Sequence, residues 1–147
     1  MAILGILSSI AIASVMNAVH RAKQKRAMGD LRTLALSIEA YATDFNRYPA
    51  AAAGFTLPSG LVLPTASVSS LVGSLMPTYI KAIPINDGWG TPYAYSSNSA
   101  FTDYAFRSFG KDKSPQSSPG YGPTTDYNAD IILVDGAFVQ FPEGLQK

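Results

Sequence analysis

The sequence predicts an α+β protein in which one long N-terminal helix packs on a small antiparallel β-sheet head. All ten prolines lie between Pro49 and Pro142, so no proline interrupts a helix over the first 48 residues. Apolar residues at helical spacing run through the second half of that stretch, and short runs of β-forming residues occur further along the chain. We therefore divide the chain into a helix over 1–48 and a globular head over 49–147.

The composition restricts the class of protein. Of the 147 residues 47% are hydrophobic and only 14% are charged, against roughly 25% charged in a typical soluble domain, so part of the chain should lie in lipid or against other chains. The formal net charge of +1 gives no overall positive field, and we predict no direct contact with nucleic acid. Because the sequence has no cysteine, disulfides, thiol nucleophiles and thiolate-bound zinc are excluded.

The first part of the helix, residues 1–20, is predicted to span a membrane or to lie in the core of a filament. No charged residue occurs between Met1 and Val19. About 19 helical residues span roughly 28 Å, close to the ~30 Å hydrocarbon core of a bilayer. Serine hydroxyls in this stretch can bond back to helix carbonyls. The residues expected to be covered by lipid or by neighbouring helices are Ile3, Leu4, Leu7, Ile10, Ile12, Val15 and Met16.

The second part of the helix, residues 21–48, is amphipathic. The basic cluster from Arg21 to Arg26 lies where such side chains reach lipid headgroups. The helix should end near Asn46, because Pro49 biases Tyr48 away from helix. Apolar residues spaced by three and four form one face, which we expect to pack on the head: Leu31, Leu34, Ile38, Tyr41 and Phe45. The opposite face carries the charged residues Asp30, Arg32, Glu39, Asp44 and Arg47.

The head is predicted to begin with a loop over Ala50 to Pro64 and a short helix near Ser67 to Met76, which Pro77 stops. The buried face of this helix should contain Val68, Leu71, Val72 and Leu75. Strands are expected over 92–96, 101–108, 131–134 and 137–141, and Asp135-Gly136 between the last two is the strongest hairpin signal in the chain. Residues 110–127 are rich in Ser, Pro and Gly, and we predict a long loop there.

The sequence offers little for catalysis, and we predict that the protein is not an enzyme and has no catalytic residues. His20 is the only histidine, it lies at the expected membrane boundary, and no Ser or carboxylate flanks it at a spacing that suggests a triad. The sequence has no HExxH, GxSxG or phosphate-loop motif.

Four aspartates lie in or beside the long loop, at positions 112, 126, 130 and 135. Ca²⁺ takes six to eight oxygen ligands from carboxylates and main-chain carbonyls, so a loop that gathers two or three of these side chains could be held by the ion. In the alternative interpretation Asp112 and Asp126 are solvated, Asp130 caps a strand and Asp135 opens the hairpin turn. The spacing alone leaves both interpretations open.

Four segments resemble a known family. Residues 1–13 resemble the middle of the N-terminal helix of type IV pilins, which in the family follows a leader peptide and a Phe-Thr-Leu-Ile-Glu element, so we expect these to precede Met1. The head segments 87–93, 108–112 and 129–131 resemble the major pseudopilin of type II secretion systems. The sequence departs from the family at Ala13, where a proline is common, and in the length and proline content of the 110–127 loop.

The resemblance implies a structural subunit of a helical filament that acts as a piston in protein secretion. Such a subunit is a homo-oligomer, waits in the inner-membrane lipid with its head in the periplasm, and is handled by type II secretion or type IV pilus assembly machinery. The resemblance also implies methylation and a Ca²⁺ ion. Its ligands would be Asp112, the Phe109 carbonyl, Asp130 and Asp126.

Three alternatives remain open at this point. The chain could be a type IV pilus pilin for adhesion, motility or DNA uptake, or a monomeric membrane-anchored ligand-binding module. It could also be a secreted protein cleaved after Ala13, although no basic segment precedes the apolar run. The basic cluster from Arg21 to Arg26 would by itself hold the head in the cytoplasm. The resemblance implies the opposite topology, which we adopt.

Overall fold

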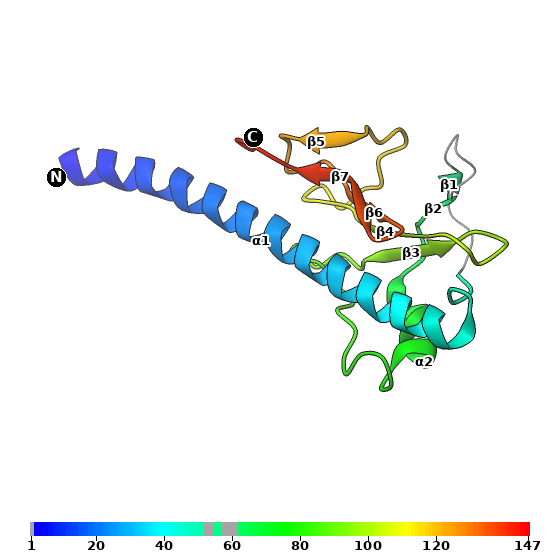
Figure 1. The fold of residues 1–147 in the computed structure, drawn as a ribbon. Coiled ribbons are helices and arrows are strands. Elements are labelled where there is room, and N and C mark those ends of the chain that lie inside the picture. The colour runs from blue at the N-terminus through cyan, green and yellow to red at the C-terminus, as the bar shows by residue number, and fades with distance from the viewer. Residues whose placement is uncertain (1, 52–54, 57–61) are drawn as a thin grey trace.

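The computed structural model describes residues 2–51, 55–56 and 62–147. Helix α1 (Ala2–Phe45) projects from the head as a bare rod and packs on the sheet with its other half (Figure 1). The predicted fold class, a long helix on a small sheet, is confirmed. The helix ends at Phe45, and Asn46 follows it with a left-handed φ of 53° while its N–H donates to the Ala42 carbonyl at 2.8 Å.

The head contains a five-stranded sheet with the strand order β3-β4-β6-β7-β5. The strands are β3 (Ala94–Ser97), β4 (Tyr104–Ser108), β5 (Gly122–Thr124), β6 (Ile131–Val134) and β7 (Ala137–Pro142). All neighbours are antiparallel except β5, which runs parallel to β7. The prediction of an antiparallel sheet and of an unbroken loop over 110–127 was therefore wrong at β5. Pro123 made this strand difficult to predict, because proline is rare in strands except at the edge of a sheet.

The hairpin between β6 and β7 turns where the sequence predicts. Asp135 and Gly136 have φ values of 46° and 80°, and a two-residue type I′ turn requires positive φ at both positions. The Asp135 carboxylate also accepts a hydrogen bond from the Tyr104 N–H at 2.9 Å. In contrast, the strand expected from Phe101 begins only at Tyr104, because Phe101 lies in a turn with a φ of 57°.

The short helix is also present, as a 3-10 turn η1 (Val68–Leu71) that continues into α2 (Val72–Leu75). Its expected buried face is correct except for Val72, which is 37% exposed. The loop predicted over Ala50 to Pro64 lies mainly outside the described residues. Its described parts include β1 (Phe55–Thr56) and β2 (Val62–Leu63), which pair antiparallel.

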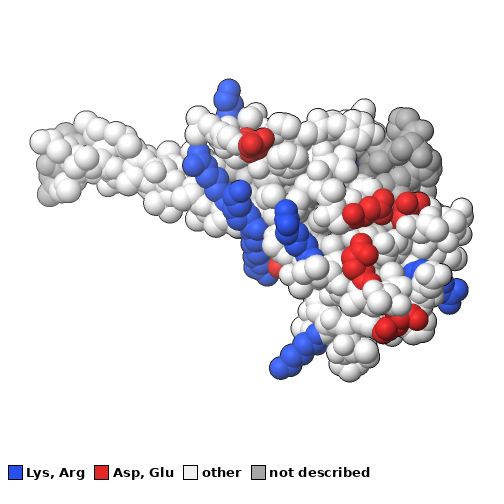
Figure 2. Space-filling view, viewed as in Figure 1, with Lys and Arg blue, Asp and Glu red and all other residues white. Residues whose placement is uncertain are grey.

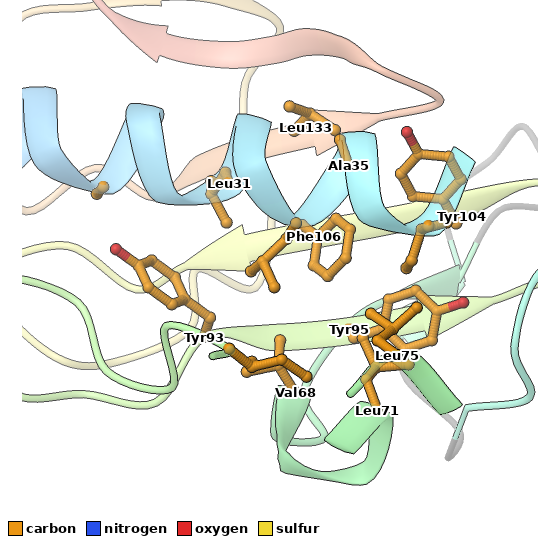
Figure 3. Close-up of a cluster of buried hydrophobic side chains, with 14 of the residues drawn as sticks. Leu31, Ala35, Val68, Leu71, Leu75, Tyr93, Tyr95, Tyr104, Phe106 and Leu133 are labelled. Carbon is orange, nitrogen blue, oxygen red and sulfur yellow. The ribbon is translucent and has the colours of Figure 1, made fainter. Parts of the chain in front are cut away.

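The core lies between the second half of α1, the short helices and one face of the sheet (Figure 3). Leu31, Leu34 and Ile38 are fully buried there, and Tyr41 is partly buried against the same cluster. Phe45 corrects the predicted packing face. It is 53% exposed, and its ring stacks on Tyr41 with the centroids 4.4 Å apart, because the helix has reached the rim of the head at this point.

Candidate filament interface and polar loop

The apolar rod, residues 3–19 of α1, is exposed along its whole length. Ser8 and Ser9 donate to the Leu4 and Ile6 carbonyls at 2.7 and 2.8 Å, so the hydroxyl groups bond within the helix as predicted. Within the described residues, α1 is the one helix long and apolar enough to cross a membrane. The predicted interface residues expose 49 to 74% of their surfaces: Ile3, Leu4, Leu7, Ile10, Ile12, Val15 and Met16.

The other half of α1 is fixed to the head by tyrosines as well as by its apolar face. Tyr93 donates to the Asp30 carboxylate at 2.8 Å, and Tyr104 donates to the Glu39 carboxylate at 3.0 Å. Burial raises the pKa values of both phenols, and the hydrogen bonds to the carboxylates raise them further. These two carboxylates were predicted to lie on the face opposite the head, and the structure places them at its edge.

Asp44 is a third helix carboxylate that meets the head. It accepts a hydrogen bond from Tyr79 at 2.6 Å, and this bond raises the pKa of Tyr79 to about 12. Tyr48 donates to the Glu39 carboxylate at 3.2 Å, and its pKa is also raised to about 12, by burial first and then by Glu39. Carboxylates therefore line the interface of α1 with the head, where neutral phenols donate to them.

A tight turn over 87–91 holds the head on α1 at the end of the rod. The Asp87 side chain is buried and accepts hydrogen bonds from the N–H groups of Trp89 and Thr91, both at 2.9 Å, and from the Ser108 hydroxyl at 2.9 Å. A Cβ added at Gly88 would lie 2.8 Å from the Lys23 Cβ, so only glycine allows this close approach to the helix. These contacts explain why Asp87 and Gly88 stand at the start of the turn.

Three other contacts hold the rod end against the head. The Trp89 indole N–H donates to His20 Nδ1 at 3.4 Å, and the Tyr127 hydroxyl donates to the Asn17 carbonyl at 3.3 Å. Gln24 donates to Gln146 at 3.1 Å. His20 is thus part of a structural contact with the head, and every residue from Val19 back to Ile3 is exposed.

Charged side chains divide the visible surface into two zones. Lysines and arginines gather where the rod meets the head, whereas the acidic side chains lie mostly over the distal head (Figure 2). The basic cluster contributes exposed Arg21, Lys25 and Arg26, and Arg26 forms an exposed ion pair with Asp30 at 3.5 Å. Positive charge therefore gathers at the level where a membrane-inserted rod would leave the hydrocarbon.

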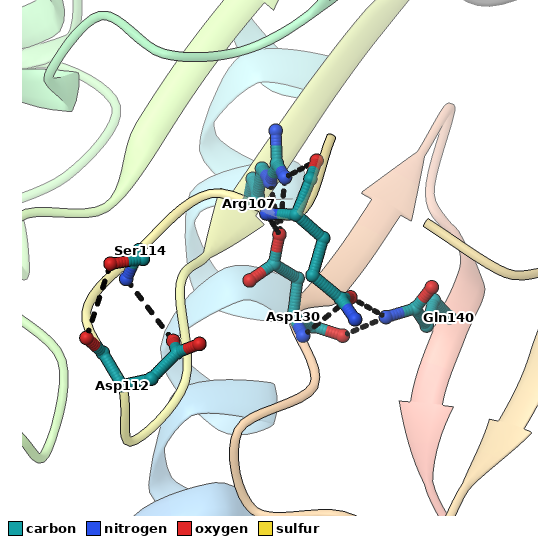
Figure 4. A network of polar contacts seen from close by, with 6 residues as sticks. Arg107, Asp112, Ser114, Asp130 and Gln140 are labelled. Carbon is teal, nitrogen blue, oxygen red and sulfur yellow. Dashed lines mark hydrogen bonds and ion pairs between the residues drawn. The ribbon is translucent and has the colours of Figure 1, made fainter. Parts of the chain in front are cut away.

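The 110–127 loop is fastened to the sheet by a buried ion pair. Arg107 on β4 is 1% exposed and its Nε donates to Asp130 Oδ2 at 2.6 Å, while its Nη2 also pairs with Asp130 (Figure 4). The same Nη2 donates to the Gln116 main-chain carbonyl at 2.6 Å. One guanidinium thus joins the strand, the segment before β6 and the loop.

Gln116 completes this network. Its N–H donates to Asp130 Oδ2 at 3.0 Å, and its side-chain oxygen accepts from the Asp130 N–H at 3.1 Å and from Gln140 at 2.7 Å. Gln140 also donates to the Asp130 carbonyl at 2.8 Å. Burial raises the pKa of the Asp130 carboxyl, and the Arg107 guanidinium and the Gln116 N–H oppose that rise.

The residues predicted to bind calcium do not fit the ion as they are placed. Asp112 and Asp126 accept hydrogen bonds from the N–H groups of Ser114 and Asn128, at 3.1 and 2.9 Å, and so brace their own turns. Within the described ranges, no three acidic or histidine side chains gather as metal ligands. The buried Asp130 Oδ1 is unpaired, but its other oxygen faces Arg107. Calcium needs six to eight oxygens without a competing cation.

Phe109, whose carbonyl was the fourth predicted ligand, lies beside the same guanidinium, which sits 5.4 Å from the centre of its ring. The sequence pattern did not predict a role for Arg107, Gln116 or Gln140. A usable signal was present, since Arg107 is a single charge inside a strand of otherwise buried residue types, and such a charge requires a partner.

A long helix that is half uncovered, with a small sheet head on its other half, is a pilin-like α+β architecture. A family model described as "Type II secretion system (T2SS), protein G" matches residues 14–132. The chain belongs to this family, the major pseudopilins that its sequence resembles.

Two curated relatives agree with this assignment. The type II secretion system core protein G of Aeromonas hydrophila is 34% identical over 113 residues, which are 75% of this chain and 74% of the relative. The core protein G of Pseudomonas aeruginosa is 29% identical over 135 residues, 88% of this chain and 83% of the relative. No solved structure is significantly similar to the chain. These matches favour neither the type IV pilus pilin nor the monomeric binding module.

Proposed function

We propose that this chain is the repeating subunit of a pseudopilus, a homo-oligomeric helical filament in which the rods bundle as the core and the heads face outward. The observation that carries the proposal is the uncovered rod. Its large apolar side chains are 39 to 74% exposed, although the same helix is fully buried at Leu31, Leu34 and Ile38. A contiguous apolar surface of this size needs a partner, and copies of the same rod supply one.

Before assembly the rod would lie in the inner membrane with the head in the periplasm. Its length matches a bilayer, and the basic cluster would then reach lipid headgroups. Because lipid already covers the rod's apolar surface, the hydrophobic effect alone does not favour the filament. The preference for the filament must come from close helix packing, and the type II secretion machinery would extract the subunits.

The proposed role is mechanical and not enzymatic. Each subunit that enters at the base lengthens the filament, so growth would push secreted proteins outward as a piston does. This role needs the rod to hold its neighbours and the head to keep its fold when the rod leaves the lipid. The tyrosine and carboxylate pairs along α1, such as Tyr93 with Asp30, support this division because they fix the head without using the rod.

Replacement of Leu7, which is 60% exposed, by Asp tests the proposal. The Leu7→Asp chain should be made together with its secretion system, and sheared filaments should be counted by electron microscopy. We expect filaments and secretion to be lost, because a charge in the apolar bundle is costly. The matched control is Leu145→Asp, on a head leucine that is 70% exposed, and it should assemble normally. An undiminished filament yield from Leu7→Asp would contradict the proposal.

A further inference from the structure

We propose that the Arg107 guanidinium takes the place of the calcium ion that the family resemblance implies. A side chain of the sheet, and not a bound metal, then fastens the 110–127 loop. This inference concerns the stability of the head and does not depend on the filament proposal. It predicts a head whose folding is independent of calcium.

Asp130 lies where a carboxylate needs a cation. This aspartate is one of the ligands implied by the resemblance, and it is 0% exposed in the structure. A buried carboxylate needs a cation or several donors, since an unpaired charge is strongly destabilising there. Arg107 supplies that cation through Nε at 2.6 Å and through a second contact from Nη2. The positive charge that calcium would bring is already covalently attached.

The guanidinium makes the same kinds of contact that a calcium ion makes in a loop. It binds one carboxylate, that of Asp130, and one main-chain carbonyl, that of Gln116 at 2.6 Å. Asp130 and Gln116 lie on opposite sides of β5 in the sequence, so the contacts close the loop around that strand. A guanidinium has no acceptor atom and cannot itself be a metal ligand.

Few of the predicted ligand side chains have oxygens left to bind calcium. Asp112 and Asp126, the other two predicted carboxylate ligands, accept hydrogen bonds from main-chain N–H groups two residues further on. Near Asp130, the buried side-chain oxygens without a hydrogen bond within the described residues are Asp130 Oδ1 and Gln140 Oε1. Calcium takes six to eight oxygens, so these two side-chain oxygens would supply only a small part of its coordination shell. A divalent ion would also be repelled by the guanidinium.

The test uses the full chain in detergent, with Trp89 fluorescence as the unfolding signal because it is the single tryptophan. Melting curves of the unsubstituted chain should coincide in 1 mM CaCl₂ and in 1 mM EGTA. This calcium concentration is about 1,000-fold above the Kd of a typical calcium-sensor site. Arg107→Ala should lower the melting temperature by roughly 10 °C in both buffers, because it leaves Asp130 buried and unpaired. It should also speed protease cleavage between residues 110 and 127.

Arg47→Ala is the matched control, since Arg47 is exposed and lines a pocket with Tyr41, Tyr48 and Phe101 that includes no residue of this network. It should melt as the unsubstituted chain does. A melting temperature of the unsubstituted chain that rises with calcium would overturn the inference, and so would an Arg107→Ala chain as stable as the control. If Arg107→Ala does not fold, the comparison of calcium with EGTA on the unsubstituted chain still decides the matter.

Discussion

The two halves of α1 differ in what covers them, although they belong to one unbroken helix. Leu34 in the second half is fully buried by the head, whereas Leu7 in the rod is 60% exposed. The second half has one apolar face and one charged face, whereas the rod has no charged residue and exposes large apolar side chains along its length. A helix that is apolar on every side is surrounded by lipid or by other helices, and an amphipathic one lies on the surface of a core.

If the rod assembles as proposed, stability and assembly use separate parts of one helix. The second half stabilises the head within a single chain, through its apolar face and through Asp30, Glu39 and Asp44. Among the hydrogen bonds of the described residues, the one nearest the N-terminus that joins the rod to the head runs from the Tyr127 hydroxyl to the Asn17 carbonyl at 3.3 Å. Substitutions in the two halves should therefore have effects that can be measured independently.

The largest expected effect on stability is that of Leu34→Ala. Removal of this fully buried side chain should lower the free energy of unfolding by about 2 to 5 kcal/mol, because it leaves a cavity in the core. Leu7→Ala, on the exposed rod, should change it by less than about 0.5 kcal/mol. Denaturant unfolding in detergent, followed by Trp89 fluorescence, measures both. Equal losses for the two variants would refute the division of the helix.

A smaller effect is expected at the turn where the two halves meet. Asp87→Ala leaves the N–H groups of Trp89 and Thr91 and the Ser108 hydroxyl without their acceptor, which should cost about 1 to 3 kcal/mol. The Trp89 emission should also shift to longer wavelength as its turn loosens on α1. Asp126→Ala is the control, because Asp126 is exposed and braces a turn within the loop. An unchanged Trp89 emission spectrum for Asp87→Ala would argue against the claim that this turn holds the head on α1.

The smallest effect should come from the tyrosines along the second half, and it depends on pH. The folded-state pKa values of Tyr48 and Tyr79 are raised from 10.0 to about 12. Phenols with a raised pKa stabilise the fold fully below pH 10, and this contribution is lost as the pH rises towards 12. The melting temperature should be level from about pH 7 to 9 and fall above about pH 10. Tyr79→Phe should reduce the fall, and an identical profile for this variant would exclude a role for Tyr79.

Most of the fold could be predicted from hydrophobic periodicity and from turn-forming residues. The helix bounds, the short helix after Ser67 and the turn at Asp135 follow from local signals such as proline positions and residues that tolerate positive φ. The short edge strand at Pro123 could not be predicted, because its pairing with β7 is parallel and distant in the sequence. Phe45 was placed one turn too far into the core, since periodicity does not reveal where the head ends.

The polar network of the loop shows the limit of motif reasoning. The 108–112 segment, which contains Asp112, and Asp130 resemble a calcium-binding loop, yet the residue that decides their chemistry is Arg107, which lies outside that pattern. A cation and a carboxylate 23 residues apart become partners only when β4 and β6 pair. The rod could be predicted because it is one continuous stretch without a charged residue. The Arg107 site could not, because it depends on a contact between residues that are distant in the sequence.

Electron cryo-microscopy of sheared filaments would show where the rod lies. We expect a filament in which residues 3–19 of each copy lie at the axis, surrounded by the same segment of neighbouring copies, with the sheet facing outward. Filaments in which the heads make the contacts and the rods stay at the periphery would contradict this expectation.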